Sequence, residues 1–245
     1  MKIIAIFNIK GGVGKTATAV NVAYCAAADK QRTLLVDLDP QAASSFYLNI
    51  KSGLEDDVRK VVSGSKSIEN SIWETAFVHL DLLPSDKNYS KLDHFILQLK
   101  KDKKWLRSFF KPVKKEYDVV VVDCPPGLTP LSENVLKNAD VVVVPMIPTT
   151  LSVRTYDQLL EYFTENRLDA SKLLPFFSMV DRRRTLHYEV MEEFSKKHKE
   201  CAAIAVPYNS EVEKMGIYKA PIVHKYPYAE ASLMYEKLWK ETKKR

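Results

Sequence analysis

Apolar and polar residues alternate along the chain in blocks that predict β-strands and α-helices in turn. The clearest strand patterns are residues 117–123 and 141–144, where runs of four valines are typical of strands buried on both faces. Other strands are expected at residues 3–7, 33–36, 79–83, 173–180 and 202–206. Helices are expected at residues 17–28, 54–62, 68–73, 89–99, 103–110, 151–167, 186–197 and 229–240, with one more between the valine strands. This alternation predicts an α/β fold with a mostly parallel, twisted sheet and helices on both faces.

The alternation of strands and helices is not interrupted by any segment that would separate two domains. No stretch rich in glycine, serine or proline divides the chain, and no internal repeat is visible. We therefore expect one domain spanning residues 1–245, with residues 51–116 as its least regular part. The first apolar run leads directly into a glycine-rich loop, so we interpret it as a buried strand and not as a signal peptide. No apolar run approaches the roughly 20 residues of a membrane span.

Composition narrows the function only slightly. The three cysteines, Cys25, Cys124 and Cys201, are far apart and predict no zinc or iron–sulfur site, and this usage fits a reducing cytoplasm. The net charge of +6 favours a polyanionic partner, although ordinary soluble proteins can also be basic. Basic residues concentrate at 182–184 and at 100–115. We expect the second group to be a solvated helix face whose aromatic residues face the core.

The strongest chemical signal lies at residues 10–16, between the first strand and the first helix. Three of the seven glycines of the chain fall here, and they let backbone N–H groups turn toward an anion at the start of a helix. An ordinary glycine-rich turn would not need the Lys15-Thr16 ending. Lys15 is expected to reach the β- and γ-phosphates of a nucleotide, and the Thr16 hydroxyl to bind Mg²⁺. The expected nucleotide contacts are Lys10, Gly11, Gly12, Val13, Gly14, Lys15, Thr16 and Ala17.

Aspartates follow two other predicted strands. Asp123 ends the four-valine run, as the Mg²⁺-binding aspartate of a Walker B motif does, and its alternative role is to start a turn. Asp37 and Asp39 lie on the same side of an extended chain, where one can brace the loop while the other faces the γ-phosphate. Turn formation before Pro40 is the alternative for this pair. The glycine-rich loop and both aspartate segments follow the C-terminal ends of predicted parallel strands. In open α/β sheets, ligands bind at that edge.

The glycine-rich loop departs from the general motif, because it has Ile9 where glycine is usual and a second lysine, Lys10. It resembles the deviant Walker A box of the ParA/MinD group of P-loop ATPases. The resemblance covers nearly the whole chain and is weakest at residues 51–116. Its further matching segments are residues 34–41, 117–127, 138–145, 178–183, 207–211 and 219–222.

The resemblance implies a site shared by two subunits. In the family, the residue that matches Lys10 reaches the phosphates of the nucleotide held by the partner subunit, and the residue that matches Asp39 positions the attacking water. The catalytic set implied is Lys10, Lys15 and Asp39. The metal set implied is Thr16, Asp39 and Asp123.

The resemblance also implies a slow, Mg²⁺-dependent ATPase stimulated by a ParB-like or other activator protein. Its ATP-bound homodimer would bind DNA without sequence preference and position a plasmid, chromosome or protein cargo, in a cytoplasmic, nucleoid-associated location. Loops after the last strands would line the adenine pocket, and the matching residues, which are otherwise loop residues, are Met179, Pro207 and Asn209. The candidate DNA contacts are Arg182, Arg183 and Arg184, for which structural or adenine-side roles are the alternative.

Three other functions are alternatives to this one. A MinD-like membrane switch would use the last helix, where Leu233 and Trp239 lie beside lysines, although glutamates weaken its attraction to anionic lipid. We expect that helix to pack on the domain. A metabolic enzyme that phosphorylates or amidates a small molecule would need an inserted substrate pocket, and no insertion is evident. Electron transfer of the nitrogenase-iron-protein type lacks a plausible set of cluster cysteines.

Overall fold

An eight-stranded sheet organises the protein. The computed structural model describes residues 1–53, 58–86, 88–89, 92–98 and 105–245. The strand order is β3-β4-β2-β5-β1-β6-β7-β8, and every neighbouring pair is parallel except β3 and β4. The strands are β1 (Lys2–Ile6), β2 (Thr33–Asp37), β3 (Trp73–Glu74), β4 (Leu80–Leu83), β5 (Val119–Asp123), β6 (Val141–Met146), β7 (Leu173–Val180) and β8 (Ala205–Pro207). The predicted fold class is confirmed.

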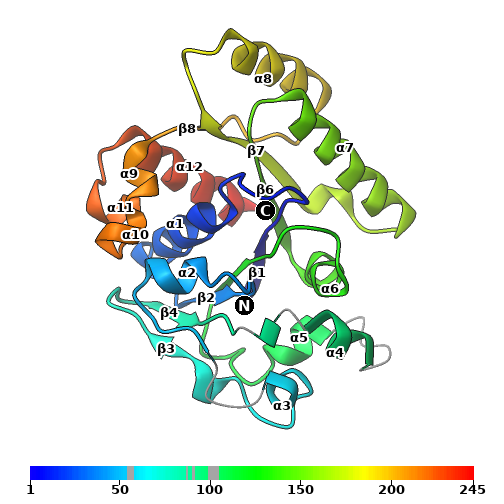
Figure 1. Cartoon of the computed structure of the whole chain (residues 1–245), viewed down its shortest axis with the longest axis vertical. Helices are drawn as coiled ribbons and strands as arrows, with labels where there is room; N and C mark the ends of the chain where they lie inside the picture. Colours follow the sequence, from blue (N-terminus) through cyan, green and yellow to red (C-terminus); the bar gives the residue numbers. More distant parts are fainter. Residues whose placement is uncertain (54–57, 87, 90–91, 99–104) are drawn as a thin grey trace.

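Helices cover both faces of this sheet (Figure 1). The α-helices are α1 (Lys15–Ala28), α2 (Ala43–Tyr47), α3 (Val58–Val62), α4 (Leu92–Gln98), α5 (Trp105–Phe109), α6 (Pro130–Asn138), α7 (Thr150–Glu165), α8 (Thr185–Lys197), α9 (Ser210–Glu213), α10 (Met215–Tyr218), α11 (Ile222–Lys225) and α12 (Glu230–Lys244). The 3₁₀ turns that the structure describes in full include η1 (Glu69–Ser71) and η3 (Ala170–Lys172).

The core forms two apolar layers because successive strand residues point to opposite faces. In β1, Ile4 and Ile6 join α1, α11 and α12 in one layer. Ile3 and Ala5 join α5, α6, α7 and α8 in the other layer. Strands that are buried on both sides must be apolar throughout, which explains the valine runs of β5 and β6.

Strand register brings the predicted site together. Ile6 of β1 is level with Asp123 of β5, and Asp37 of β2 is level with the same aspartate. Three consecutive neighbours in the sheet therefore end at one height, and the chain segments that follow them meet there. This is the carboxyl edge of the sheet at which the sequence predicts the ligand.

Residues 68–73 differ from the predicted helix. The structure has the single turn η1, followed by β3, which pairs antiparallel with β4 through Trp73–Leu82 and Glu74–Asp81. The pairing partner lies outside the predicted helix, so local periodicity could not reveal it. Five-residue α2 and four-residue α9, α10 and α11 were also not predicted, because such short helices show little periodicity. Parts of the helices expected at 54–62, 89–99 and 103–110 lie outside the described residues.

Helix α12 packs on the domain, as predicted. Leu238 is fully buried, and the indole N–H of Trp239 donates to Asp29 Oδ2 at 3.1 Å at the end of α1. Leu233 is exposed. Among the described residues, no helix is both long and apolar enough to cross a membrane. In α5, the buried Trp105 and Phe109 confirm that the aromatic residues of the basic run face the core.

Replacing Leu238 with alanine should destabilise the protein by about 2–5 kcal/mol, because it leaves a cavity between α12 and α1. Leu233→Ala, the same change on the exposed side of the same helix, should cost about 0.5 kcal/mol or less. Urea denaturation gives both free energies of unfolding. Equal losses for the two variants would contradict the packing described for α12.

Candidate functional site

The loop at residues 10–16 has the backbone of an anion-binding loop. Gly12 and Gly14 have φ angles of 72° and 86°, in the left-handed region that glycine adopts without strain. Gly14 is the N-cap of α1, and its carbonyl accepts hydrogen bonds from the N–H and the hydroxyl of Thr18 at 3.0 and 2.7 Å. The unpaired N–H groups at the start of α1 therefore open onto the loop, where they can bind phosphate oxygens.

Three neighbouring segments hold this loop in place. The Asn8 side chain donates to the carbonyl of Pro145 in β6 at 2.9 Å and accepts from the Lys10 N–H at 2.8 Å. Ser178 in β7 donates its hydroxyl to the Val13 carbonyl at 2.7 Å. Asn8 was not predicted as a site residue, and Ser178 was noted only within residues 178–183, a segment that resembles the family.

The Lys15 ammonium lies inside the loop. It is buried, and it donates to the carbonyl of Lys10 at 2.9 Å. Burial lowers the Lys15 pKa, while the charges of Asp123 and Asp39 favour its protonated form. The loop thus holds a cation beside the N–H groups that a phosphate would contact.

Asp37 and Asp123 form a buried acidic pair beside this cation. Both are fully buried at the ends of adjacent strands. Desolvation, followed by repulsion between the two carboxylates, raises the pKa of Asp123, and desolvation also raises the pKa of Asp37. Two serines of α2 oppose these effects: Ser44 donates to Asp123 Oδ2 at 2.8 Å, and Ser45 donates to Asp37 Oδ2 from both its N–H and its hydroxyl.

The Asp123 carboxyl lies beside the Thr16 hydroxyl, whose hydrogen bond favours its charged form. Asp123 Oδ1 is buried and has no hydrogen-bond partner among the described residues. Within the described part of the chain, no three His, Cys, Asp or Glu side chains form a metal cluster. Mg²⁺ is commonly held by one or two protein oxygens plus phosphate oxygens, so Thr16 and Asp123 fit it when a nucleotide supplies the remaining ligands.

Asp37 and Asp39 have different environments. Asp37 is the bracing member, because its Oδ1 also accepts the Asp39 N–H at 3.3 Å. Asp39 is only partly buried, and its Oδ1 accepts the N–H of Gln41 at 3.0 Å. The side chain of Asp39 is therefore the more accessible of the two at this edge.

The three adenine-side candidates also meet at the carboxyl edge. Val180, which follows Met179, is level with Pro207 of β8, and the Tyr208 N–H donates to the Val180 carbonyl at 3.0 Å. Met179 has a φ of 53°, and the side chain of Asn209 caps α9. Their contact with adenine remains a prediction.

The arginine cluster lies just past the end of β7, and each arginine meets a carboxylate. Arg183 donates to both oxygens of Asp181, at 2.9 and 3.0 Å, and Arg184 lies 3.5 Å from the same group. Arg182 pairs with Glu230. Hydrogen bonds from Arg183 lower the Asp181 pKa to about 2. These contacts hold the arginines in place and neutralise part of their charge.

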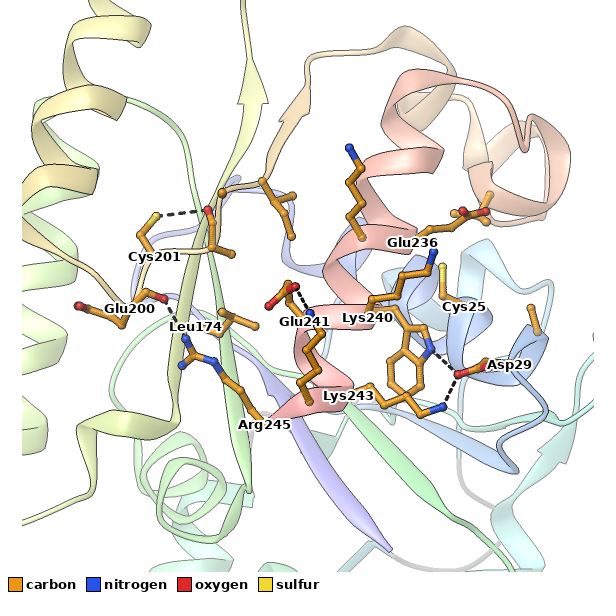
Figure 2. A pocket seen from close by; sticks show the side chains of 18 of the residues that line it. Cys25, Asp29, Leu174, Glu200, Cys201, Glu236, Lys240, Glu241, Lys243 and Arg245 are labelled. Carbon is orange, nitrogen blue, oxygen red and sulfur yellow. Dashed lines mark hydrogen bonds and ion pairs between the residues drawn. The ribbon is translucent and has the colours of Figure 1, made fainter.

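A hollow of about 1090 Å³ lies away from this site, beside the end of α12 (Figure 2). Lys243 and the Trp239 indole both contact Asp29 there, and Arg245 donates to the Glu200 carbonyl. None of the predicted site residues lines this hollow. Its size therefore does not make it the nucleotide site.

Asp123→Asn should change how stability depends on pH. Because the Asp123 pKa is raised on folding, its contribution is favourable below the ordinary carboxyl pKa of about 4 and is lost as the pH rises through the folded-state pKa. Asparagine removes this loss and the repulsion on Asp37. The free energy of unfolding of the variant, minus that of the wild type, should increase between about pH 5 and pH 9 in urea denaturation without nucleotide.

Asp118→Asn is the matched control. Hydrogen bonds from Arg32 lower the Asp118 pKa to about 2, so this group should already be charged in both the folded and unfolded states above pH 5. The free energy of unfolding of Asp118→Asn, minus that of the wild type, should be constant between about pH 5 and pH 9. A constant difference for Asp123→Asn as well would show that the acidic pair is not a source of strain.

Known proteins support the family suggested by the sequence. A family model described as AAA domain matches residues 1–174. The sporulation initiation inhibitor protein Soj of Bacillus subtilis is 30% identical over 246 residues, which cover 98% of this chain and 97% of Soj. The chromosome partitioning protein ParA of Myxococcus xanthus is 28% identical over 228 residues, which cover 91% of this chain and 81% of ParA.

A solved structure shares the fold. An ATP complex of a variant of Cyanothece McdA superposes with a TM-score of 0.84 at 17% identity, covering 100% of this chain and 96% of McdA. At this identity the likeness concerns the fold alone, and the family assignment depends on the sequence matches. The chain belongs to the ParA/MinD family of partition ATPases.

Proposed function

We propose that the protein is a Mg²⁺-dependent ATPase that acts as an ATP-bound dimer on DNA. The observation that carries the proposal is the convergence of Lys15, the start of α1 and the Asp37–Asp123 pair, with Asp123 Oδ1 left without a described partner. Together these groups match a metal-bound triphosphate: N–H groups and a lysine for the phosphates, and a hydroxyl and a carboxylate for the metal.

Each residue has a distinct task in this proposal. Bound Mg²⁺ would neutralise charge on the β- and γ-phosphates, and Thr16 and Asp123 would hold it. Lys15 stabilises the charge that develops on the γ-phosphoryl group. Asp39 orients the attacking water, because its side chain is the accessible carboxylate at this edge. In-line attack needs an oriented water and charge compensation more than a strong base.

Lys10 supports the proposal of a shared site. Its backbone is fixed on both sides, since its N–H donates to Asn8 and its carbonyl accepts from Lys15. No ion pair within the described part of the chain engages its ammonium group. The lysine is therefore available to a nucleotide held by a second copy of the chain.

We propose that the dimer binds DNA without sequence preference through Arg182, Arg183 and Arg184, and that it positions its cargo in this way. Their positions are fixed by Asp181 and Glu230, and the Arg183 side chain is still 85% exposed. The similarity to a chromosome partitioning protein, ParA of Myxococcus xanthus, supports partition as the process. A cytoplasmic, nucleoid-associated location and a separate activator protein are further parts of this proposal. The buried apolar face of α12 disfavours the MinD-like alternative, in which this helix would enter a membrane.

Asp39→Ala should leave ATP binding and ATP-dependent dimers intact while lowering phosphate release roughly 100-fold or more, because the water loses its orienting group. Phosphate release in single turnover and light scattering with ATP measure the two properties. Normal phosphate release from this variant would contradict the role of Asp39.

Two lysine variants serve as controls for that experiment. Lys15→Ala should lose ATP binding and therefore the dimer as well. Lys10→Ala should bind ATP but remain monomeric. A Lys10 variant that dimerises with ATP as the wild type does would remove the support for a shared site.

Arg183→Ala should weaken ATP-dependent binding to plasmid DNA. The slope of the logarithm of the binding constant against the logarithm of the salt concentration should become smaller by about one unit, because one phosphate contact is lost. Arg32→Ala is the matched control, since Arg32 makes the same two-point contact with Asp118 at the opposite edge of the sheet. Co-sedimentation with plasmid and with anionic liposomes, each with and without ATP, is the assay. ATP-dependent sedimentation with liposomes alone would favour the membrane switch instead.

A further inference from the structure

Ser85 links the end of β4 to the catalytic edge of the sheet. It lies outside every sequence motif and is fully buried. Its hydroxyl donates to the carbonyl oxygen of Asp39 at 2.5 Å, and its N–H donates to the hydroxyl oxygen of Ser45 at 3.1 Å. The Ser85 carbonyl accepts the N–H of Gly53 at 2.7 Å. The serine is therefore held by its backbone while its side chain holds the backbone of Asp39.

Ser45 completes a ring of hydrogen bonds. Its hydroxyl accepts from Ser85 and donates to Asp37 Oδ2 at 2.7 Å. The other oxygen of Asp37 accepts the N–H of Asp39. The ring runs from Asp37 through Ser45 and Ser85 to the Asp39 carbonyl, and it returns to Asp37 through the Asp39 N–H. Both polar backbone groups of Asp39 are thus bound to side chains that are themselves buried.

We propose that Ser45 and Ser85 are positioning residues for Asp39, setting where its carboxylate meets the attacking water. This inference depends on the proposed role of Asp39 in hydrolysis. The side chain of Asp39 has a described hydrogen bond only from the N–H of Gln41, inside its own turn. Its direction relative to the phosphates is therefore set through its backbone, and the ring is what connects that backbone to the ends of β2 and β4.

The two serine hydroxyls are distinct from the groups proposed to contact the nucleotide. Ser85 and Ser45 contact neither the loop at residues 10–16 nor Thr16 through any described hydrogen bond. Loss of the Ser85 hydroxyl leaves the Asp39 carbonyl bonded to the N–H of Ala42 at 2.9 Å, so the turn keeps one anchor. We therefore expect an effect on turnover that is separate from ATP affinity.

Ser85→Ala should lower kcat about 10- to 100-fold, because small displacements of a reacting geometry cost that much. The KM for ATP and the ATP dissociation constant should stay within about threefold. Ser85→Thr keeps the hydroxyl and should recover most of kcat. Single-turnover phosphate release and equilibrium binding of ATP give the two parameters, and thermal unfolding reports folding of each variant.

Ser71→Ala is the matched control, since Ser71 is also fully buried and its hydroxyl has no described hydrogen-bond partner. It should retain the wild-type kcat. If Ser85→Ala does not fold, Ser85→Cys carries the same test, because a thiol occupies the site but is a weaker hydrogen-bond donor. A kcat equal to that of Ser71→Ala, or a threonine variant no better than alanine, would overturn the proposal.

Asp39→Ala separates this inference from the proposed function. If that variant hydrolyses ATP normally, the role of Asp39 is wrong and the positioning role falls with it. If it is inactive while Ser85→Ala turns over at the wild-type rate, only the positioning role is wrong.

Discussion

The arrangement of this protein depends on two carboxylates that share a buried space. Asp37 and Asp123 end adjacent parallel strands at the same height, where burial raises the pKa of both and the charge of Asp37 raises the pKa of Asp123 further. Hydrogen bonds from Ser44 and Ser45 and the nearby charge of Lys15 offset part of this cost. In the proposed function, Mg²⁺ held by Thr16 and Asp123 would offset more of this cost, which supports the proposal of a metal-bound nucleotide at this edge.

The sheet makes this strain possible. Strands that are apolar on both faces are held from both sides, so their ends cannot separate to relieve the repulsion. Helix α2 then covers the pair directly after the turn that carries Asp39, and its two serines bind one carboxylate each. A five-residue helix with little propensity of its own is thus retained because it satisfies buried acceptors.

Much of this could be predicted from the sequence, because the signals were local. The valine runs, the glycine-rich loop and the aspartates at strand ends each occupy a few consecutive residues, and they fixed the fold class and the edge that carries the site. Ser85, Asn8 and Ser178 could not be predicted, since their partners lie 46, 137 and 165 residues away in the chain. A small polar residue gives no periodic signal, and its role appears only when strands that are distant in sequence become neighbours.

Charge balance at the carboxyl edge of the sheet supports the proposed pairing of two copies of the chain. One chain offers Lys15 and the start of α1 against the carboxylates of Asp37, Asp39 and Asp123, before the phosphates of a nucleotide add further negative charge. Mg²⁺ compensates part of this excess, and the charge that moves onto the leaving phosphate during hydrolysis needs a further cation. Lys10 has a fixed backbone and no described ion pair. In the proposed function it would supply that cation to the site of another copy, and a site completed by two subunits would link hydrolysis to assembly.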